Sequence, residues 1–155
     1  MTDDSRLKAP GADTSPVAKA ATDANATVGR LVLVVEDSRP TASVVKYFLE
    51  LEGFRVLVAD DGIRGLEMAR LERPDVIVTD VQMPGMDGVA MVEALRADPR
   101  TSQIRIMMLT SESSAEGVGR GLAAGADDYL LKPVEPRGLA TRVKALCARS
   151  RSGPA

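Results

Sequence analysis

The stretch VIVTDVQMPGMDG (residues 76–88) joins an apolar run directly to an acidic residue and then to a turn. Its first four residues, Val76 to Thr79, are all β-branched, which is typical of a short buried strand. Asp80 follows at once, although burying a carboxylate is costly unless it is paired. The function of Asp80 therefore depends on which other residues the fold brings to this strand end.

Short apolar runs of similar length recur along the chain, and each fits a strand. Several lack a clear alternation of apolar and polar residues, as expected when helices cover both faces of a sheet. The other runs are LVLVV (31–35), FRVLVA (54–59), IRIMML (104–109) and YLL (129–131).

Between and after these runs, apolar residues recur at helical spacing and predict five helices. Ser38 and Pro40 are typical of a helix start, and the acidic pair at 60 and 61 fits the cap of the second helix. The fourth helix spans roughly residues 114–124. The predicted buried positions are Val44, Val45, Phe48 and Leu51 in the first helix, Ile63, Leu66 and Met68 to Leu71 in the second, Val89, Val92 and Leu95 in the third, and Leu139, Val143 and Leu146 in the fifth.

Strict alternation of strand and helix favours a parallel sheet with right-handed crossovers. The predicted fold is an α/β sandwich with a doubly wound, five-stranded parallel sheet of order 2-1-3-4-5. Ligands bind such sheets outside the carboxyl ends of the strands, where the strand order reverses. The residues at those ends are Glu36 and Asp37 after the first strand, Asp80 after the third, Thr110 and Ser111 after the fourth, and Lys132 after the fifth.

The predicted order makes the first and third strands neighbours, so Glu36, Asp37 and Asp80 converge. Two carboxylates about 4 Å apart repel by roughly 4 kcal/mol at an effective dielectric near 20, so the three would raise one another's pKa or bind a cation. The chain has no His and one cysteine, Cys147, which leaves oxygen ligands. Three carboxylates, one acting through water, suit Mg²⁺ better than Ca²⁺.

The ordered set ED (36–37), DVQMPGMDG (80–88), TS (110–111) and YLLKP (129–133) resembles the receiver domain of two-component response regulators, of the stand-alone, chemotaxis-regulator type. The resemblance covers about residues 30–150 and implies a flavodoxin-like (βα)₅ fold. It makes Asp80 the phosphoryl acceptor, with Asp37, Asp80 and the backbone carbonyl of Gln82 as Mg²⁺ ligands. Glu36 would bind the ion through a water molecule.

The resemblance also assigns residues around the phosphoryl group. Thr110 would hydrogen-bond it, Lys132 would pair with it, and Tyr129 would change rotamer with Thr110 in the switch. The Lys132–Pro133 peptide bond is expected to be cis. Gln82 and Glu112 are the positions that would tune the lifetime of the acyl phosphate.

The same resemblance implies a signalling partner rather than a turnover enzyme. A chain without His needs an external donor, which would be a sensor histidine kinase or a histidine phosphotransfer protein. The chain would catalyse only its own phosphorylation and a slow dephosphorylation. Phosphatases with an aspartate nucleophile are the alternative, but they carry a second Asp two residues later, where this chain has Gln82.

The two ends of the chain indicate how a signal would be passed on. Residues 1–29 are rich in Ala, Asp and Thr and predict a disordered tail, followed by a receiver domain at 30–150 and a tail at 151–155. Only about seven residues follow the fifth helix, so a noncovalent output is expected. The chain would be a stand-alone regulator that binds a target protein through the fourth helix, fifth strand and fifth helix. A phosphorelay shuttle or sink and a fragment of a longer protein are the alternatives.

Net charge and hydropathy limit the partners and the location. A net charge of −2 and a pI of about 5.3 predict no direct nucleic-acid or membrane contact. The sequence has neither an apolar run long enough to span a bilayer nor a signal peptide, which favours a cytoplasmic location.

Three glycines, Gly117, Gly119 and Gly121, lie in the predicted fourth helix. Each costs about 1 kcal/mol relative to Ala, which predicts a marginal helix that is easily repositioned when Asp80 is phosphorylated. Close packing of the glycines, or a loop in place of the helix, is an equal alternative.

Overall fold

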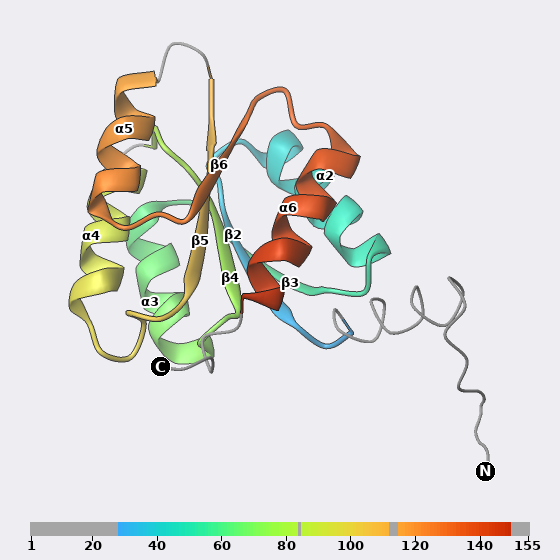
Figure 1. The fold of residues 1–155 in the computed structure, drawn as a ribbon, viewed down its shortest axis with the longest axis horizontal. Coiled ribbons are helices and arrows are strands. Elements are labelled where there is room, and N and C mark those ends of the chain that lie inside the picture. Colours follow the sequence, from blue (N-terminus) through green and yellow to red (C-terminus); the bar gives the residue numbers. More distant parts are fainter. Residues whose placement is uncertain (1–27, 84, 112–114, 150–155) are drawn as a thin grey trace.

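The structure is a computed structural model, and it describes residues 28–83, 85–111 and 115–149. Within these residues strands and helices alternate strictly along the chain, as predicted (Figure 1). The elements are β2 (Leu31–Val35), α2 (Arg39–Leu51), β3 (Arg55–Ala59), α3 (Gly62–Glu72), β4 (Val76–Asp80), α4 (Gly88–Ala97), β5 (Arg105–Thr110), α5 (Ala115–Ala124), β6 (Asp128–Leu131) and α6 (Pro136–Ala148).

The five strands form one parallel sheet in the order β3-β2-β4-β5-β6. Counted along the chain this is 2-1-3-4-5, so the predicted fold class is confirmed. β4 lies in the centre, with Thr79 opposite Val35 of β2 and Asp80 opposite Leu109 of β5. The order therefore reverses between β2 and β4, which is where such sheets bind ligands.

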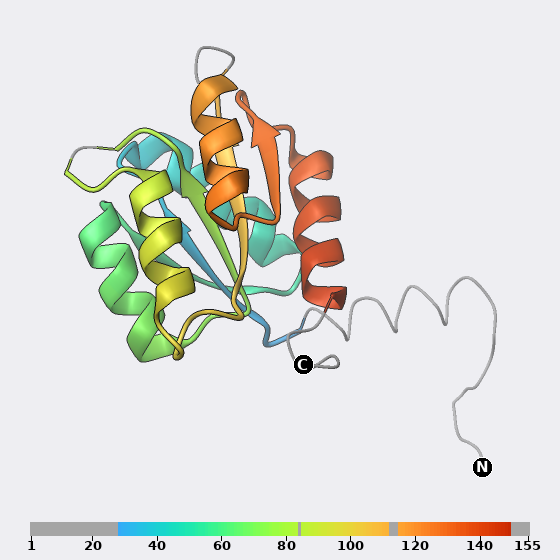
Figure 2. The same cartoon turned by 60° about the vertical axis from the view of Figure 1, so that its left-hand side comes forward.

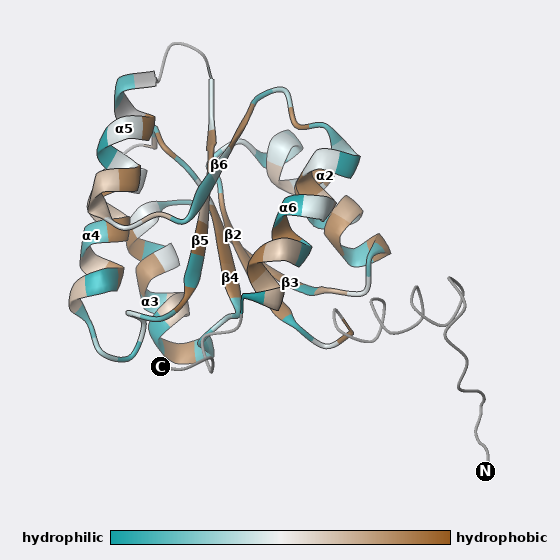
Figure 3. Ribbon diagram, viewed as in Figure 1, coloured by the Kyte–Doolittle hydropathy of each residue, from teal (hydrophilic) through white to brown (hydrophobic). Residues whose placement is uncertain are grey.

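Helices cover both faces of the sheet. α2 and α6 lie on one face, and α3, α4 and α5 lie on the other (Figures 1 and 2). The central strands are mostly hydrophobic along their length, whereas the helices carry both hydrophobic and hydrophilic residues (Figure 3). Every residue of β2 and β4 is buried. This arrangement explains why the strands read as continuous apolar runs.

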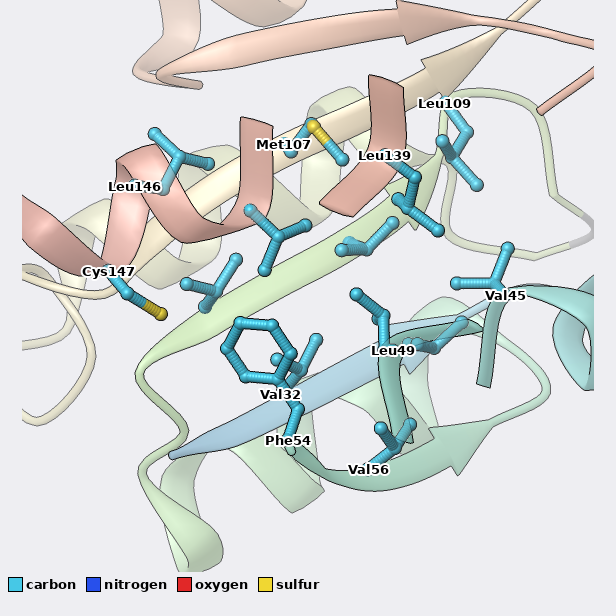
Figure 4. Packing of buried hydrophobic residues seen from close by; sticks show 14 residues of the cluster. Val32, Val45, Leu49, Phe54, Val56, Met107, Leu109, Leu139, Leu146 and Cys147 are labelled. Carbon is cyan, nitrogen blue, oxygen red and sulfur yellow. The ribbon is translucent and has the colours of Figure 1, made fainter. Parts of the chain in front are cut away.

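Two large clusters of buried side chains fill the layers between sheet and helices. The first joins Val34 and Met107 to Leu49 of α2 and Leu139 of α6 (Figure 4). The second, on the other face, is built from β2, β4 and β5 against α3 and α4. A third and smaller cluster joins α4, α5 and β5 to the residue after Asp80; its buried members are Val81, Val89, Met108 and Val118.

The predicted buried face was partly wrong in the first two helices. In α2 the buried residues are Ala42, Val45 and Leu49, whereas Leu51 is 63% exposed. In α3 the buried residues are Gly62, Gly65, Leu66 and Ala69, whereas Leu71 is 80% exposed. In α3 the small residues are buried because the helix packs closely on β2: a Cβ on Gly65 would lie 2.8 Å from Val35 Cγ2. The apolar stripes predicted in α4 and α6 are confirmed.

Each of the first three helices starts under a side-chain cap, after a short loop for α2 and α3 and after the longer loop 81–87 for α4. Ser38, Asp61 and Asp87 accept hydrogen bonds from the N–H groups of Thr41, Arg64 and Ala90. Such caps satisfy N–H groups that have no partner within the helix. They fix the loops at the carboxyl edge of the sheet. No helix in the described part of the chain is long and apolar enough to cross a membrane.

Candidate functional site

Three acidic residues meet at the carboxyl ends of the neighbouring strands β2 and β4. Glu36 and Asp37 follow β2, and Asp80 is the last residue of β4. Each contributes a carboxylate oxygen, and these oxygens all lie within 4.8 Å of one another. Glu36 and Asp80 are buried, whereas Asp37 is exposed and forms the open side of the group. The structure thus brings together the three acids at the point where the strand order reverses.

Lys132 reaches the same group from the carboxyl end of β6, the strand at one edge of the sheet. Its backbone N–H donates to the carbonyl oxygen of Thr110 over 2.7 Å, which holds the segment after β6 against the end of β5. The Lys132–Pro133 peptide bond is cis, as the sequence resemblance implied. The ammonium nitrogen then lies 3.0 Å from Asp80 Oδ2 and 3.1 Å from Glu36 Oε1.

Both carboxylate oxygens of Asp80 have defined partners. Oδ2 accepts the hydrogen bond from Lys132 Nζ, and Oδ1 accepts one of 3.3 Å from the backbone N–H of Gln82. The Gln82 side chain itself is exposed. The carboxylate is therefore oriented by a backbone group from its own loop and by a side chain from a strand two positions away in the sheet.

Glu36 is the most deeply buried of the three acids, with 2% of its surface exposed. Its Oε2 accepts a hydrogen bond from the Ser38 N–H. Its Oε1 forms an ion pair with Lys132 but accepts no well-aligned hydrogen bond among the described residues. Burial raises the pKa of Glu36, and the negative charge of Asp80 raises it further. The hydrogen bond from the Ser38 N–H lowers the pKa, but the net shift is upward.

The pKa of Lys132 is also shifted by its surroundings. Burial lowers the pKa of its ammonium group, but the hydrogen bond to Asp80 and the ion pairs with Asp80 and Glu36 outweigh burial, and the pKa is raised overall. Lys132 is therefore held in its charged form.

The group can hold a divalent cation. Three carboxylates face one ammonium group, which leaves an excess of negative charge at a buried strand end. Glu36 Oε1 is buried without a well-aligned hydrogen bond, and the available donors are all oxygens. A hard, oxygen-seeking ion such as Mg²⁺ fits this set of donors.

The other predicted site residues are Thr110, Tyr129 and Glu112. Thr110 ends β5 and is buried; its hydroxyl donates to the Ser111 carbonyl over 3.1 Å. Tyr129 lies on β6 beside Met108 of β5, with its side chain 40% exposed. Glu112 lies outside the described residues, so its predicted tuning role stays a prediction.

Sequence reasoning missed two residues that contact the backbone of Asp80. The hydroxyl of Thr79, which is fully buried, donates to the Asp80 carbonyl oxygen over 3.0 Å. A Cβ added to Gly88 would lie 2.3 Å from the same oxygen. A hydroxyl at the end of an otherwise apolar strand was the one available signal for Thr79.

Comparison with known proteins assigns this chain to a family. The family model described as the response regulator receiver domain matches residues 32–144. The DNA-binding response regulator MtrA of Mycobacterium tuberculosis is 39% identical over 129 residues, which cover 83% of this chain and 55% of MtrA. The transcriptional regulatory protein PrrA of Mycobacterium bovis is 44% identical over 118 residues, 76% of this chain and 50% of PrrA. The chain thus spans about half the length of the curated relatives it matches.

Solved structures of response regulators and receiver domains also resemble this chain. A chemotaxis response regulator of Vibrio cholerae has a TM-score of 0.72 at 36% identity, covering 77% of this chain and 99% of that one. The receiver domain of a sensor histidine kinase from Pseudomonas aeruginosa, which has a magnesium ion coordinated in its active site cleft, has a TM-score of 0.73 at 29% identity, covering 78% and 99%. The matched family model and these relatives show that the chain belongs to the response regulator receiver domain family.

Proposed function

We propose that this chain is a phosphoryl-accepting switch in which Asp80 is the acceptor. The observation that carries the proposal is the position of Asp80 at the end of the central strand, 3.0 Å from Lys132 Nζ and among three convergent carboxylates. One Asp80 oxygen attacks phosphorus while the bond from phosphorus to the imidazole nitrogen of a phosphohistidine donor breaks. The products are an acyl phosphate on Asp80 and the free imidazole of the donor.

The remaining residues of the site would orient and neutralise the charge that moves in this step. Mg²⁺, held by Asp37, Asp80 and the Gln82 carbonyl and through water by Glu36, would supply electrostatic stabilisation of the phosphoryl oxygens. Lys132 would pair with one of those oxygens when Asp80 Oδ2 becomes the bridging oxygen of the acyl phosphate. Thr110 would turn its hydroxyl from Ser111 to the phosphoryl group.

Gln82 favours a switch over a phosphatase. A phosphatase with an aspartate nucleophile needs an acid and base near the acyl phosphate, and Gln82 supplies neither at the position two residues after Asp80. The acyl phosphate would therefore persist long enough to be read by another protein. The chain would not turn over an external substrate.

A partner-binding output is supported by apolar side chains that remain exposed on one side of the fold. Leu122 of α5 and Tyr129 and Leu131 of β6 are each between 40% and 48% exposed. Together with α6 they form the face that we expect a target protein to contact. This favours a binding switch over a phosphate sink, which needs no such face.

The upstream donor would be a sensor histidine kinase or a histidine phosphotransfer protein. MtrA is by name a DNA-binding regulator, and this chain spans about half of it. The absence of direct nucleic-acid contact stays a prediction that rests on the chain's net charge of −2 and pI of about 5.3. The tail boundaries at 1–29 and 151–155 also stay predictions, because residues 1–27 and 150–155 lie outside the described residues.

The assignment of Asp80 is tested by intact-mass measurement after incubation with acetyl phosphate and Mg²⁺. The wild-type chain should gain one phosphoryl group, and Asp80→Asn should gain none. Asp128→Asn, which changes the carboxylate at the start of β6, at the opposite end of that strand from Lys132, should be phosphorylated like the wild type. An unmodified wild type, or an adduct that survives in Asp80→Asn, would refute the assignment.

A further inference from the structure

We infer that Thr79 is a positioning residue for phosphoryl transfer, because its hydroxyl fixes the peptide unit that orients the Asp80 carboxylate. The inference rests on the proposed function of Asp80 as the phosphoryl acceptor. Thr79 is fully buried in a strand whose other residues before Asp80 are all aliphatic. A buried hydroxyl must be hydrogen-bonded, and this one donates to the Asp80 carbonyl oxygen over 3.0 Å.

The same carbonyl oxygen is enclosed from a second side by the start of α4. A Cβ on Gly88 would lie 2.3 Å from Asp80 O and 3.0 Å from Val81 Cα, which is closer than side chains approach backbone atoms. The Gly88 N–H also donates to the Val81 carbonyl over 2.8 Å. The helix that follows the site therefore packs directly on the backbone of Asp80, and only glycine leaves room for it.

The peptide unit between Asp80 and Val81 is thus held at both ends. Its carbonyl accepts from Thr79, and its N–H donates to the Leu109 carbonyl of β5 over 3.2 Å. The next backbone N–H, that of Gln82, is the group that binds Asp80 Oδ1. Rotation of the held peptide unit would move the Gln82 N–H away from Oδ1 and leave the carboxylate with Lys132 as its one described hydrogen-bond donor.

Carboxylate orientation matters here because transfer of a phosphoryl group needs near in-line approach of the attacking oxygen. A nucleophile that samples several orientations reacts more slowly even when its partners remain in place. Thr79 would act through this orientation, without touching the phosphoryl group itself.

The chain offers a matched control for the loss of a buried threonine hydroxyl. Thr101 is also fully buried, and its hydroxyl donates to the Leu95 carbonyl over 2.7 Å. It lies between α4 and β5, at the amino edge of the sheet and away from Asp80. Thr101→Val therefore removes the same kind of interaction from the same fold without affecting the site.

The test compares the full chain with Thr79→Val, Thr79→Ser and Thr101→Val. The rate of acyl phosphate formation from acetyl phosphate is measured by intact mass at saturating Mg²⁺, and stability is measured by urea unfolding. We expect Thr79→Val to react about ten-fold more slowly, Thr79→Ser to regain most of the rate, and Thr101→Val to lose stability but keep the wild-type rate.

Two results would overturn the inference while leaving the assignment of Asp80 intact. One is a wild-type rate in Thr79→Val; the other is an equal loss of rate in Thr79→Val and Thr101→Val, which would indicate a general effect of instability. A wild-type chain that takes up no phosphoryl group at all would remove the proposed function, and this inference with it.

Discussion

The ammonium nitrogen of Lys132 lies 3.0 Å from Oδ2 of Asp80, so that one cation after the last strand neutralises the acid at the end of the central strand. Lys132 also forms an ion pair with Glu36. Its positive charge offsets part of the negative potential that would attract a divalent cation. Lys132 and the cation would therefore compete electrostatically, although both would favour the proposed transfer step.

Replacing Lys132 should separate these two effects. Lys132→Met removes a positive charge next to Asp80, so we expect Mg²⁺ to bind more tightly by calorimetry. The rate of phosphorylation by acetyl phosphate should fall by about ten-fold or more, because the phosphoryl oxygens lose a charged partner. Lys144→Met, which removes a lysine paired with Glu52 on the outside of the fold, should change neither quantity. Weaker Mg²⁺ binding in Lys132→Met would contradict this account.

Glu36 should destabilise the fold when Mg²⁺ is absent. Its pKa is raised in the folded state, chiefly by burial, so its ionised form is less favourable there than in the unfolded chain. The stability that this shift provides is complete below the ordinary pKa of 4.5 and is lost as the pH rises through the raised value. We therefore expect Glu36→Gln to be more stable than the wild type at pH 7 without Mg²⁺.

The measurement is urea unfolding of both chains at pH 7 and at pH 4, with and without Mg²⁺. The difference between the chains should shrink at pH 4, where Glu36 is largely protonated in both the folded and the unfolded state. Added Mg²⁺ should stabilise the wild type more than Glu36→Gln, because the wild type retains the carboxylate. A Glu36→Gln chain that is less stable at pH 7 without Mg²⁺ would show that its pairing with Lys132 outweighs its burial.

Two glycines of α5 should respond in opposite ways to the same substitution. A Cβ on Gly119 meets no atom within 4 Å, so Gly119→Ala should stabilise the chain by about 1 kcal/mol. A Cβ on Gly121 would lie 2.3 Å from Met108 Cε, in a fully buried environment, and Gly121→Ala should destabilise it by about 1–3 kcal/mol. Urea unfolding measures both changes.

This pair also bears on the two explanations of the glycines in α5. The structure supports close packing for Gly121, whereas Gly119 has open space around it. Amide exchange would test the mobility of the helix, because protection across residues 115–124 equal to that of α4 would exclude an easily repositioned helix. Faster exchange in α5, reduced in Gly119→Ala, would favour it.

Arg96 should be the most important arginine for stability among those in described ion pairs. Its guanidinium donates to the carbonyls of Gly125, Ser102 and Ile104 and to Asp127, and thereby joins α4 to the segments before β5 and β6. Arg96→Met should cost about 2–4 kcal/mol in urea unfolding, because it removes a charged donor from several partly buried carbonyl acceptors at once. The exposed Arg100 also forms an ion pair, with Asp98, yet Arg100→Ala should change stability by less than about 1 kcal/mol. Equal effects would mean that the Arg96 contacts are replaced by water.

The fold was predictable because its signals are local and repeated. The predicted strand runs start and end within one residue of the observed strands, since a parallel sheet covered on both faces leaves uninterrupted apolar segments. The predicted strand order then brought Glu36, Asp37 and Asp80 together, because the carboxyl ends of neighbouring parallel strands lie at the same edge of the sheet. Lys132 followed from the same rule applied to the last strand.

What the sequence did not predict depends on close packing in three dimensions. The buried face of α3 uses glycine and alanine, so a search for large apolar residues selected Ile63 and Leu71, which are exposed. The contacts of Thr79 and Gly88 with the Asp80 carbonyl depend on the path of the loop between β4 and α4. Helical periodicity contains no information about such contacts.

The site is assembled from residues that are far apart in the chain, which links its chemistry to the order of folding. Lys132 and Asp80 are separated by 52 residues, and β4 must pair with both β2 and β5 before its carboxyl end is complete. Contacts of this range form late and slowly relative to local helices. During synthesis, a ribosome-bound chain that has not yet exposed β6 would lack the lysine. The full rate of the proposed phosphorylation should therefore appear only after β6 has joined the sheet, and chains that lack it should react slowly.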